Sequence, residues 1–189
     1  MADDAQQNTD LIEVIVSDHR AVEGVFSQLE QGQGDPAQRK GMVDHVITEL
    51  VRHSVAEEQY MYPAARKALP DGDRIADHEI EEHAEAERVM KELSGLQPED
   101  PRFEELLGTL MSDIRHHVED EENDLLPRLR ESCGKDELQQ LGSKVLRAKE
   151  SAPTRPHPTA PDTPPANRIL DPGAGLVDRM RDSLAGSGR

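Results

Sequence analysis

The chain has 189 residues, 34% hydrophobic and only 2% aromatic, and its formal net charge is −17. Such an acidic chain repels nucleic-acid phosphates and anionic lipid, so we expect neither nucleic acid nor a membrane as a partner. A single cysteine excludes an intramolecular disulfide, and we find neither a membrane-spanning apolar run nor a signal-peptide pattern, which predicts a cytoplasmic protein.

Four long stretches with helical spacing follow one another along the chain. Their apolar stripes run from Ile12 to Leu29, from Val43 through Tyr60 to Ala64, from Ala76 to Leu93, and from Leu107 to Glu121. The pairs Asp35-Pro36 and Asp100-Pro101 each provide an N-cap acceptor followed by a proline at the first helical position. Short connections make successive helices antiparallel neighbours. We therefore predict an all-α, up-down-up-down four-helix bundle, with a short fifth helix over 135–149.

The composition changes after residue 150. Residues 151–168 contain six prolines and read as an extended, solvated linker. The last segment has one short amphipathic patch, formed by Leu176, Val177, Met180 and Leu184. We predict a bundle domain over 1–150 and a Pro-rich, largely disordered tail over 151–189. The alternative is that the patch docks on the bundle or on a protein partner.

An internal repeat places polar residues on the apolar stripes. His19 and His83 are 64 residues apart, as are His53 and His117, and Glu57 and Glu121 keep the same offset. Prolines 63 and 127 keep it as well. Two helix hairpins therefore present the same polar layer, and their pseudo-twofold pairing would bring the four histidines to one level.

The spacing within each hairpin selects the inward carboxylates. Residues four apart on a helix point the same way, so Glu57 lies on the face of His53 and Glu121 on that of His117. The adjacent Glu58 and Glu122 are predicted to face solvent. Burying two carboxylates without a counter-charge costs many kcal/mol, and a bound cation removes that cost. Imidazole and carboxylate together suit first-row transition metals.

Six donors are more than one tetrahedral zinc ion uses, whereas two carboxylates can bridge two ions with two histidines each. The alternative is a purely structural polar layer. Four further residues are weaker candidates. Glu23 and Glu87 lie four residues after a histidine and are either additional ligands or flanking solvated groups. Glu79 precedes His83 by four residues. Tyr60 either donates a hydrogen bond to a ligand carboxylate or to bound oxygen, or is a half-buried aromatic.

These residues carry a family resemblance. His19, "HSVAE" (53–57), His83 and "HVEDE" (117–121) form a pattern similar to the H–HxxxE–H–HxxxE pattern of the hemerythrin-like, or HHE cation-binding, family. The continuations "EEQYMYP" and "EENDLLP" fit it too, over roughly residues 10–130. The resemblance implies a four-helix bundle around two non-heme iron ions bridged by carboxylates and by an oxo or hydroxo group. It maps the ligands onto His19, His53, Glu57, His83, His117 and Glu121.

The resemblance also indicates function. Oxygen-carrying hemerythrins have a fifth histidine from an HxxxH on the third helix, and this chain has Glu79 and Glu87 around His83 instead. Similar bacterial proteins are linked to O2 or redox sensing, nitric oxide and peroxide responses, and iron homeostasis. We therefore expect an iron protein that binds or reacts with O2, NO or peroxide, with catalase-like turnover as one form. The alternatives are an iron-responsive binding module without catalysis and a helical scaffold with an incidental polar layer.

Overall fold

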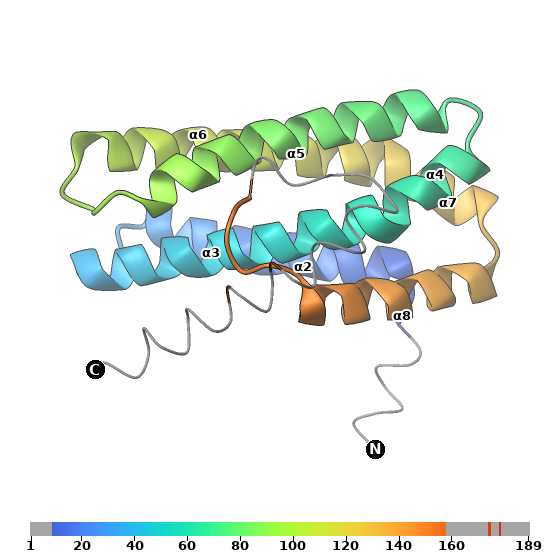
Figure 1. Ribbon diagram of the computed structural model, residues 1–189, viewed down its shortest axis with the longest axis horizontal. Helices are drawn as coiled ribbons and strands as arrows, with labels where there is room; N and C mark the ends of the chain where they lie inside the picture. Colours follow the sequence, from blue (N-terminus) through green and yellow to red (C-terminus); the bar gives the residue numbers. More distant parts are fainter. Residues whose placement is uncertain (1–8, 158–173, 175–177, 179–189) are drawn as a thin grey trace, which may run out of the picture.

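The computed structural model describes residues 9–157 together with Ala174 and Asp178. Within this part of the chain, long helices lie side by side in an antiparallel bundle (Figure 1), which confirms the predicted fold class. The elements are α2 (Leu11–Glu30), α3 (Pro36–Ala56), η1 (Glu57–Met61), α4 (Tyr62–Ala68), α5 (Gly72–Ser94), α6 (Pro101–Asp120), η2 (Glu121–Leu125), α7 (Leu126–Ser132) and α8 (Lys135–Ser151). None of the described helices is long and apolar enough to cross a membrane.

Aspartate caps fix where three helices begin. Asp35 accepts a hydrogen bond from the Gln38 N–H, and Asp100 accepts one from the Arg102 N–H, each with a proline in the first turn as predicted. The side chain of Asp10 caps α2 in the same way. Because these acceptors satisfy N–H groups that the helix leaves free, they set the register of each stripe.

Two π-helical turns interrupt the long helices at equivalent places. In η1 the backbone N–H of Tyr62 donates to the Glu57 carbonyl, five residues back, and η2 repeats this between Leu126 and Glu121. A proline follows each turn, and proline has no N–H and crowds the carbonyl four residues before it, so a regular α-ladder cannot continue there. Each turn holds one more residue than an α-turn, which shifts the following stripe by one position.

This shift corrects the predicted second stripe. The sequence pattern placed Tyr60 and Ala64 inward, but both are half-buried, and Met61, Tyr62 and Ala65 are the buried residues instead. A regular 3.6-residue period does not anticipate the π-turn, which explains the error.

The polar layer divides the apolar core into two parts. One cluster packs residues of α2, α4, α7 and α8, including Leu11, Leu129 and Leu138. The other packs the opposite half of α2, α3, α5 and α6, including Phe26 and Phe103. The histidines therefore lie between two clusters of buried apolar side chains.

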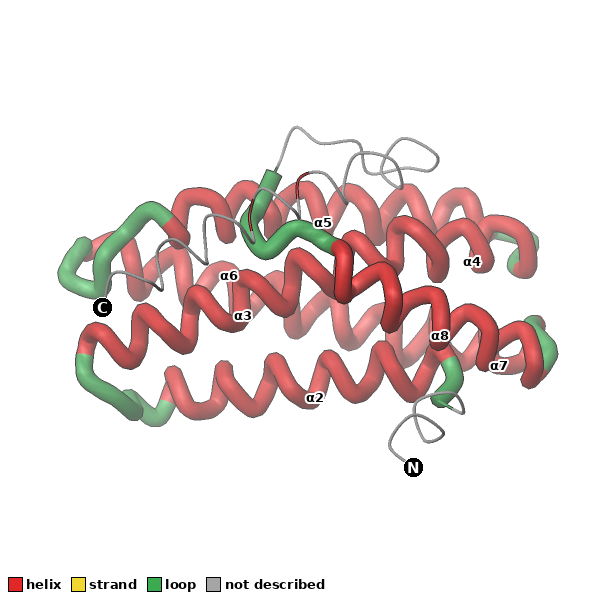
Figure 2. The backbone as a smooth tube through the Cα atoms, turned by 60° about the horizontal axis from the view of Figure 1, so that its bottom comes forward, coloured by secondary structure: helices red, strands yellow, loops and turns green. Residues whose placement is uncertain are grey.

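The fifth helix is longer than predicted by two residues, and the chain that follows it is buried rather than solvated. Residues 152–157, which we call the strap, run from α8 towards α5 (Figures 1 and 2), and Ala152, Pro153, Thr154 and Pro156 are buried. The Thr154 carbonyl accepts from Thr48 of α3, and the His157 N–H donates to Glu87 of α5. The prediction of a solvated linker is therefore wrong for 152–156, where backbone groups find partners on the bundle. The predicted disordered tail and its patch lie outside the described residues, apart from Ala174 and Asp178.

Candidate metal centre

Four buried histidines meet at one level of the bundle, one from each of α2, α3, α5 and α6. The ring centroids of His19 and His53 are 5.0 Å apart, and we call these two residues the first pair. The centroids of His83 and His117, the second pair, are 4.7 Å apart. The Nε2 atoms face inward: those of His83 and His117 are 3.2 Å from each other.

Glu57 lies between the two pairs and is fully buried. Its Oε1 is 3.0 Å from His53 Nε2, and its Oε2 is 3.4 Å from His83 Nε2. The two oxygens of one carboxylate therefore face different histidine pairs, which is the arrangement that a carboxylate bridging two ions requires.

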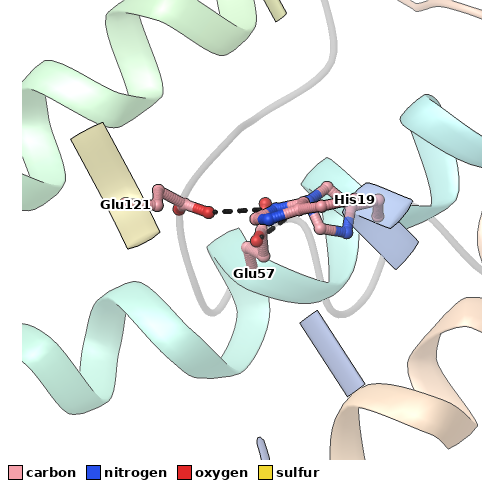
Figure 3. A group of neighbouring side chains, drawn as sticks. His19, Glu57 and Glu121 are labelled. Carbon is pink, nitrogen blue, oxygen red and sulfur yellow. Dashed lines mark ion pairs between the residues drawn. The ribbon is translucent and has the colours of Figure 1, made fainter. Parts of the chain in front are cut away.

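Glu121 repeats this arrangement from the opposite hairpin. Its Oε2 is 3.4 Å from His19 Nε2, and its Oε1 is 3.8 Å from His117 Nε2. Figure 3 shows Glu121 reaching towards His19, with Glu57 close beside it. The structure thus brings together all six residues that the sequence selected, and one donor atom from each of His19, His53, Glu57 and Glu121 lies within 4.8 Å of the others. Their role as metal ligands stays a prediction.

Four donor atoms at the centre lack hydrogen bonds. His19 Nε2, both oxygens of Glu57 and Glu121 Oε2 are buried, and none has a hydrogen-bond partner in the described structure, although imidazole nitrogens lie at ion-pair distance. Buried polar groups in folded proteins are nearly always satisfied. Because the atoms left over are anionic oxygens and imidazole nitrogens that point at one another, the residues present fit a bound cation.

A second ring of carboxylates holds the outer nitrogens of the histidines. Within the first pair, His19 Nδ1 is 2.9 Å from Glu122 and His53 Nδ1 is 3.3 Å from Asp18. Within the second pair, His83 Nδ1 is 3.1 Å from Glu58 and His117 Nδ1 is 2.9 Å from Glu82. A carboxylate at Nδ1 keeps the proton there, which orients the ring and leaves the Nε2 lone pair for a metal.

This ring corrects the predicted placement of Glu58 and Glu122. Both were expected to face solvent, but their side chains are only 11% and 21% exposed and reach a histidine on a neighbouring helix. The angular argument considered each helix alone, whereas in the bundle the side of one helix lies against the outer nitrogen of the next.

Electrostatics in the metal-free cluster favour protonated histidine. Burial alone lowers the pKa of His53, but the charge of Glu57 and the contact with Asp18 outweigh burial and raise the pKa to about 10. Burial likewise opposes the charged form of Glu57, yet His53 and His83 hold the pKa of its carboxyl well below the usual value. Protons therefore serve as the counter-charge that a metal ion would replace.

The tyrosine at the cluster is Tyr62 rather than Tyr60. The Tyr62 hydroxyl donates to Glu121 Oε1 at 3.0 Å and lies 3.1 Å from His83 Nε2. Tyr60, the predicted donor, is half-buried and packs against the apolar cluster around α4. The π-turn accounts for the exchange, because it rotates the residue five positions after Glu57 onto the inward face.

The three additional acidic candidates have different surroundings. Glu79 is buried, and its Oε2 is 2.9 Å from His117 Nδ1, on the outer side of the ring. Burial raises the pKa of this carboxyl. Glu23 instead pairs with Arg115 at 2.8 Å, with its side chain 43% exposed. Glu87 accepts the His157 N–H at 2.6 Å. The structure thus brings Glu79 to the cluster, whereas Glu23 contacts Arg115 and Glu87 contacts the strap.

Comparison with known proteins identifies the family. The family model for the hemerythrin HHE cation binding domain matches residues 10–129. This chain belongs to the hemerythrin HHE family. The matched residues include both histidine pairs, both central glutamates and both π-turns, so the HHE domain coincides with the bundle that carries the site.

Relatives of this HHE protein come from distant organisms. An uncharacterized hemerythrin-like protein of Schizosaccharomyces pombe is 28% identical over 93% of this chain and 87% of its own length. A protein of a Nostoc species named DNA nickase is 25% identical over 79% of this chain, but only 42% of its own length is matched. The crystal structure of a hemerythrin HHE cation binding domain-containing protein from Mycobacterium kansasii has a TM-score of 0.65, with 22% identity, and covers 75% of this chain and 86% of that one. That similarity shows a shared fold.

A signal in the HHE sequence could have identified the outer carboxylates. Asp18 and Glu82 are 64 residues apart, and so are Glu58 and Glu122, which is the offset of the histidines. The repeat therefore marks the outer ring as well as the inner one. It does not mark Tyr62, whose repeat partner is Leu126, or Glu79, whose partner is Ile15. These two polar residues make the second histidine pair different from the first.

Proposed function

We propose that this HHE protein holds two iron ions at the centre of the bundle and there binds or reacts with a small oxidant such as O2, NO or peroxide. The observation that carries the proposal is the division of each central carboxylate, one oxygen facing each histidine pair. The first pair would hold one ion and the second pair the other, with Glu57 and Glu121 shared between them.

The chain's own side chains prepare these positions. Asp18, Glu58, Glu82 and Glu122 hold the outer nitrogens, so that every Nε2 is available at the centre. When bound, iron supplies one-electron redox chemistry and free coordination positions for a small ligand. Four imidazoles with two central carboxylates form a less anionic donor set than ferritin-like sites, which favours ferrous–ferric cycling.

The space beside the cluster suits a small ligand. A cavity touches all four histidines and is bounded on its other side by apolar side chains, including Val22, Leu50, Ile114 and Val118. The volume of this cavity is about 20 Å³, and a cavity needs roughly 10–15 Å³ on the same scale to hold one water. Its small size suits a ligand such as O2 or NO.

A neighbouring pocket between α2 and α3 would give a small ligand access to this cavity. This pocket is lined by Ala21, Val25 and Val46 and shares Asp18, Val22 and His53 with the cavity. Its walls are mostly apolar, which suits the passage of O2 or NO.

Tyr62 provides a proton-bearing group at the second pair. Burial, and then the charge of Glu121, raise the pKa of Tyr62 well above its ordinary value. The hydroxyl therefore stays protonated and donates a hydrogen bond to Glu121 Oε1. The second pair is accordingly the half at which a bound oxidant would meet a hydrogen-bond donor.

Metal analysis with anaerobic titration tests the proposal. We expect aerobically purified protein to carry about two irons per chain with near-ultraviolet charge-transfer absorption, and the reduced protein to respond spectrally to O2, NO or peroxide. Oxygen evolution from peroxide, abolished by His117→Ala, would assign catalase-like turnover. A colourless, metal-free protein whose stability does not respond to iron would refute the proposal.

One observation favours the alternative of an iron-responsive binding module. Asp178 accepts from the backbone N–H groups of Thr154 and Arg155 and contacts His157 Nε2, and the strap in turn contacts Glu87, one turn from His83. Iron occupancy could thus be transmitted to the tail through α5. Chelator-induced changes in proteolysis of the tail, without any reaction of the iron form with O2, NO or peroxide, would favour this module.

A further inference from the structure

A second group of metal-ligating side chains lies on the outer surface of α5 and α6. We call it the surface quartet: His78 and Glu82 of α5, and His116 and Asp120 of α6, each pair four residues apart. Glu82 Oε1 is 3.6 Å from His78 Nε2 and 3.9 Å from His116 Nε2. Asp120 Oδ2 is 4.0 Å and 3.7 Å from the same two nitrogens.

The second half of the bundle differs here from the first. Asp18, the repeat partner of Glu82, has its outer oxygen, Oδ1, bound by the ammonium group of Lys149 at 2.6 Å. Among the described residues, neither Lys nor Arg pairs with Glu82 or Asp120, and the outer oxygen of Glu82 faces two imidazoles instead. Burial, and then the charges of Glu85 and Glu82, raise the pKa of nearby Asp113, while His116 opposes this shift. In the first half of the bundle the Lys149 ammonium group supplies a cation at this position, and in the second half we expect a bound metal ion to do so.

We propose that the surface quartet binds one divalent transition-metal ion of the zinc or ferrous class. Such ions bind imidazole nitrogen and carboxylate oxygen at about 2.0–2.2 Å, which places neighbouring ligand atoms in a tetrahedral site roughly 3.4 Å apart. The four histidine–carboxylate distances in the quartet exceed this by about 0.2–0.6 Å. His78, Glu82 and Asp120 have donor atoms within 4.8 Å of one another, and His116 lies outside that group. The exposed His116 side chain therefore has to move closer to His78 for all four residues to share one ion. Calcium and magnesium prefer oxygen ligands only, so two imidazoles disfavour them.

The position of the quartet suggests what its ion is for. Glu82 Oε2 accepts a hydrogen bond from His117 Nδ1 at 2.9 Å, so a single carboxylate joins the surface quartet to the second histidine pair. The quartet is therefore a loading point, where a ferrous ion is captured beside the buried centre. This role rests on the proposed function, whereas the binding of an ion at the quartet does not.

Two measurements on the full chain test the inference separately. Protein already loaded at its buried centre is titrated with Co²⁺, whose visible absorption reports tetrahedral nitrogen and oxygen ligands. We expect one further equivalent to bind saturably, with at least tenfold weaker binding after His78→Ala or His116→Ala and no change after His45→Ala, an exposed histidine on α3. Binding that is absent, or that the two quartet variants leave unchanged, would overturn the site.

The second measurement follows uptake of Fe²⁺ by the metal-free chain. We expect the double variant His78→Ala/His116→Ala to fill the buried centre at least threefold more slowly than a Glu119→Ala control, an exposed position on α6, and to reach the same final iron content. Equal rates would overturn the loading role, even with Co²⁺ bound at the quartet. A chain that takes up no iron at its centre refutes the proposed function and the loading role together, and a Co²⁺ titration of that chain without prior loading, compared with its two quartet variants, then decides the site.

Discussion

The outer carboxylates provide the sharpest test of how the centre is built. Glu122 lies 2.9 Å from His19 Nδ1 and is itself held by Arg20, so it fixes both the orientation and the tautomer of that imidazole. Replacing Glu122 with alanine leaves every central donor in place. Loss of such a supporting carboxylate typically weakens metal binding 10–100-fold, which is about 1.4–2.7 kcal/mol. We therefore expect Glu122→Ala to lower affinity by that factor at the first histidine pair.

The assay is competition between the protein and a chromophoric chelator for Fe²⁺ under anaerobic conditions. Glu58→Ala, the repeat-related change, should weaken binding to a similar extent at the second pair, because Glu58 lies 3.1 Å from His83 Nδ1. Glu119→Ala is the matched control, since Glu119 is exposed on α6 and close in sequence to Glu122. If both variants bind iron within twofold of the control, the outer ring plays no part in holding the metal and our description of the centre is wrong.

Three further predictions follow from the same geometry. Removing bound metal should lower the thermal unfolding midpoint by roughly 5–11 °C. Free metal at 100 times its Kd stabilises the folded state by about 2.7 kcal/mol, and each kcal/mol corresponds to about 2–4 °C in a chain of this size. An unchanged midpoint after chelation would contradict metal-linked folding. The pKa of His53 is raised to about 10. Its proton therefore stabilises the metal-free fold fully below pH 6.5 and ceases to do so as pH rises through 10. Metal uptake at pH 7–8 should accordingly release protons and become tighter as pH rises, and a calorimetric heat that is the same in buffers of different ionisation enthalpy would refute this. Ile114→Phe should fill the cavity beside the histidines and slow the reaction with NO at least tenfold with unchanged iron content, measured by stopped flow. Val89→Phe, at a half-buried position of α5 that does not line the cavity, should not slow it, and equal rates for the two variants would show that the ligand does not use this cavity.

The internal repeat determined most of the site from the sequence. Helical period and aspartate caps were enough to place the bundle, because each stripe must be buried and each helix must begin at an acceptor. The 64-residue offset then selected His19, His53, His83 and His117 with their two glutamates, since residues on equivalent faces of two paired hairpins must meet at one level.

Other features depend on contacts between helices, which a sequence read one helix at a time does not contain. Glu58 and Glu122 were placed in solvent because their angle on their own helix points outward, yet each lies against a histidine of a neighbouring helix. Tyr62 replaced Tyr60 at the cluster because a π-turn adds one residue to the register. The surface quartet exists only where α5 packs beside α6.

The sequence by itself therefore determined the helices, the repeat and the six central donors, all of which follow from periodicity along the chain. Only the tertiary structure decided which nitrogen of each histidine faces the centre and which carboxylates hold the other nitrogen. It also decided that the strap packs on the bundle and that Asp178 packs against the strap. The physical reason is that hydrogen bonds between distant segments depend on how each helix is rotated about its axis and spaced against its neighbours. A π-turn changes that rotation, and the local sequence pattern does not predict the new one.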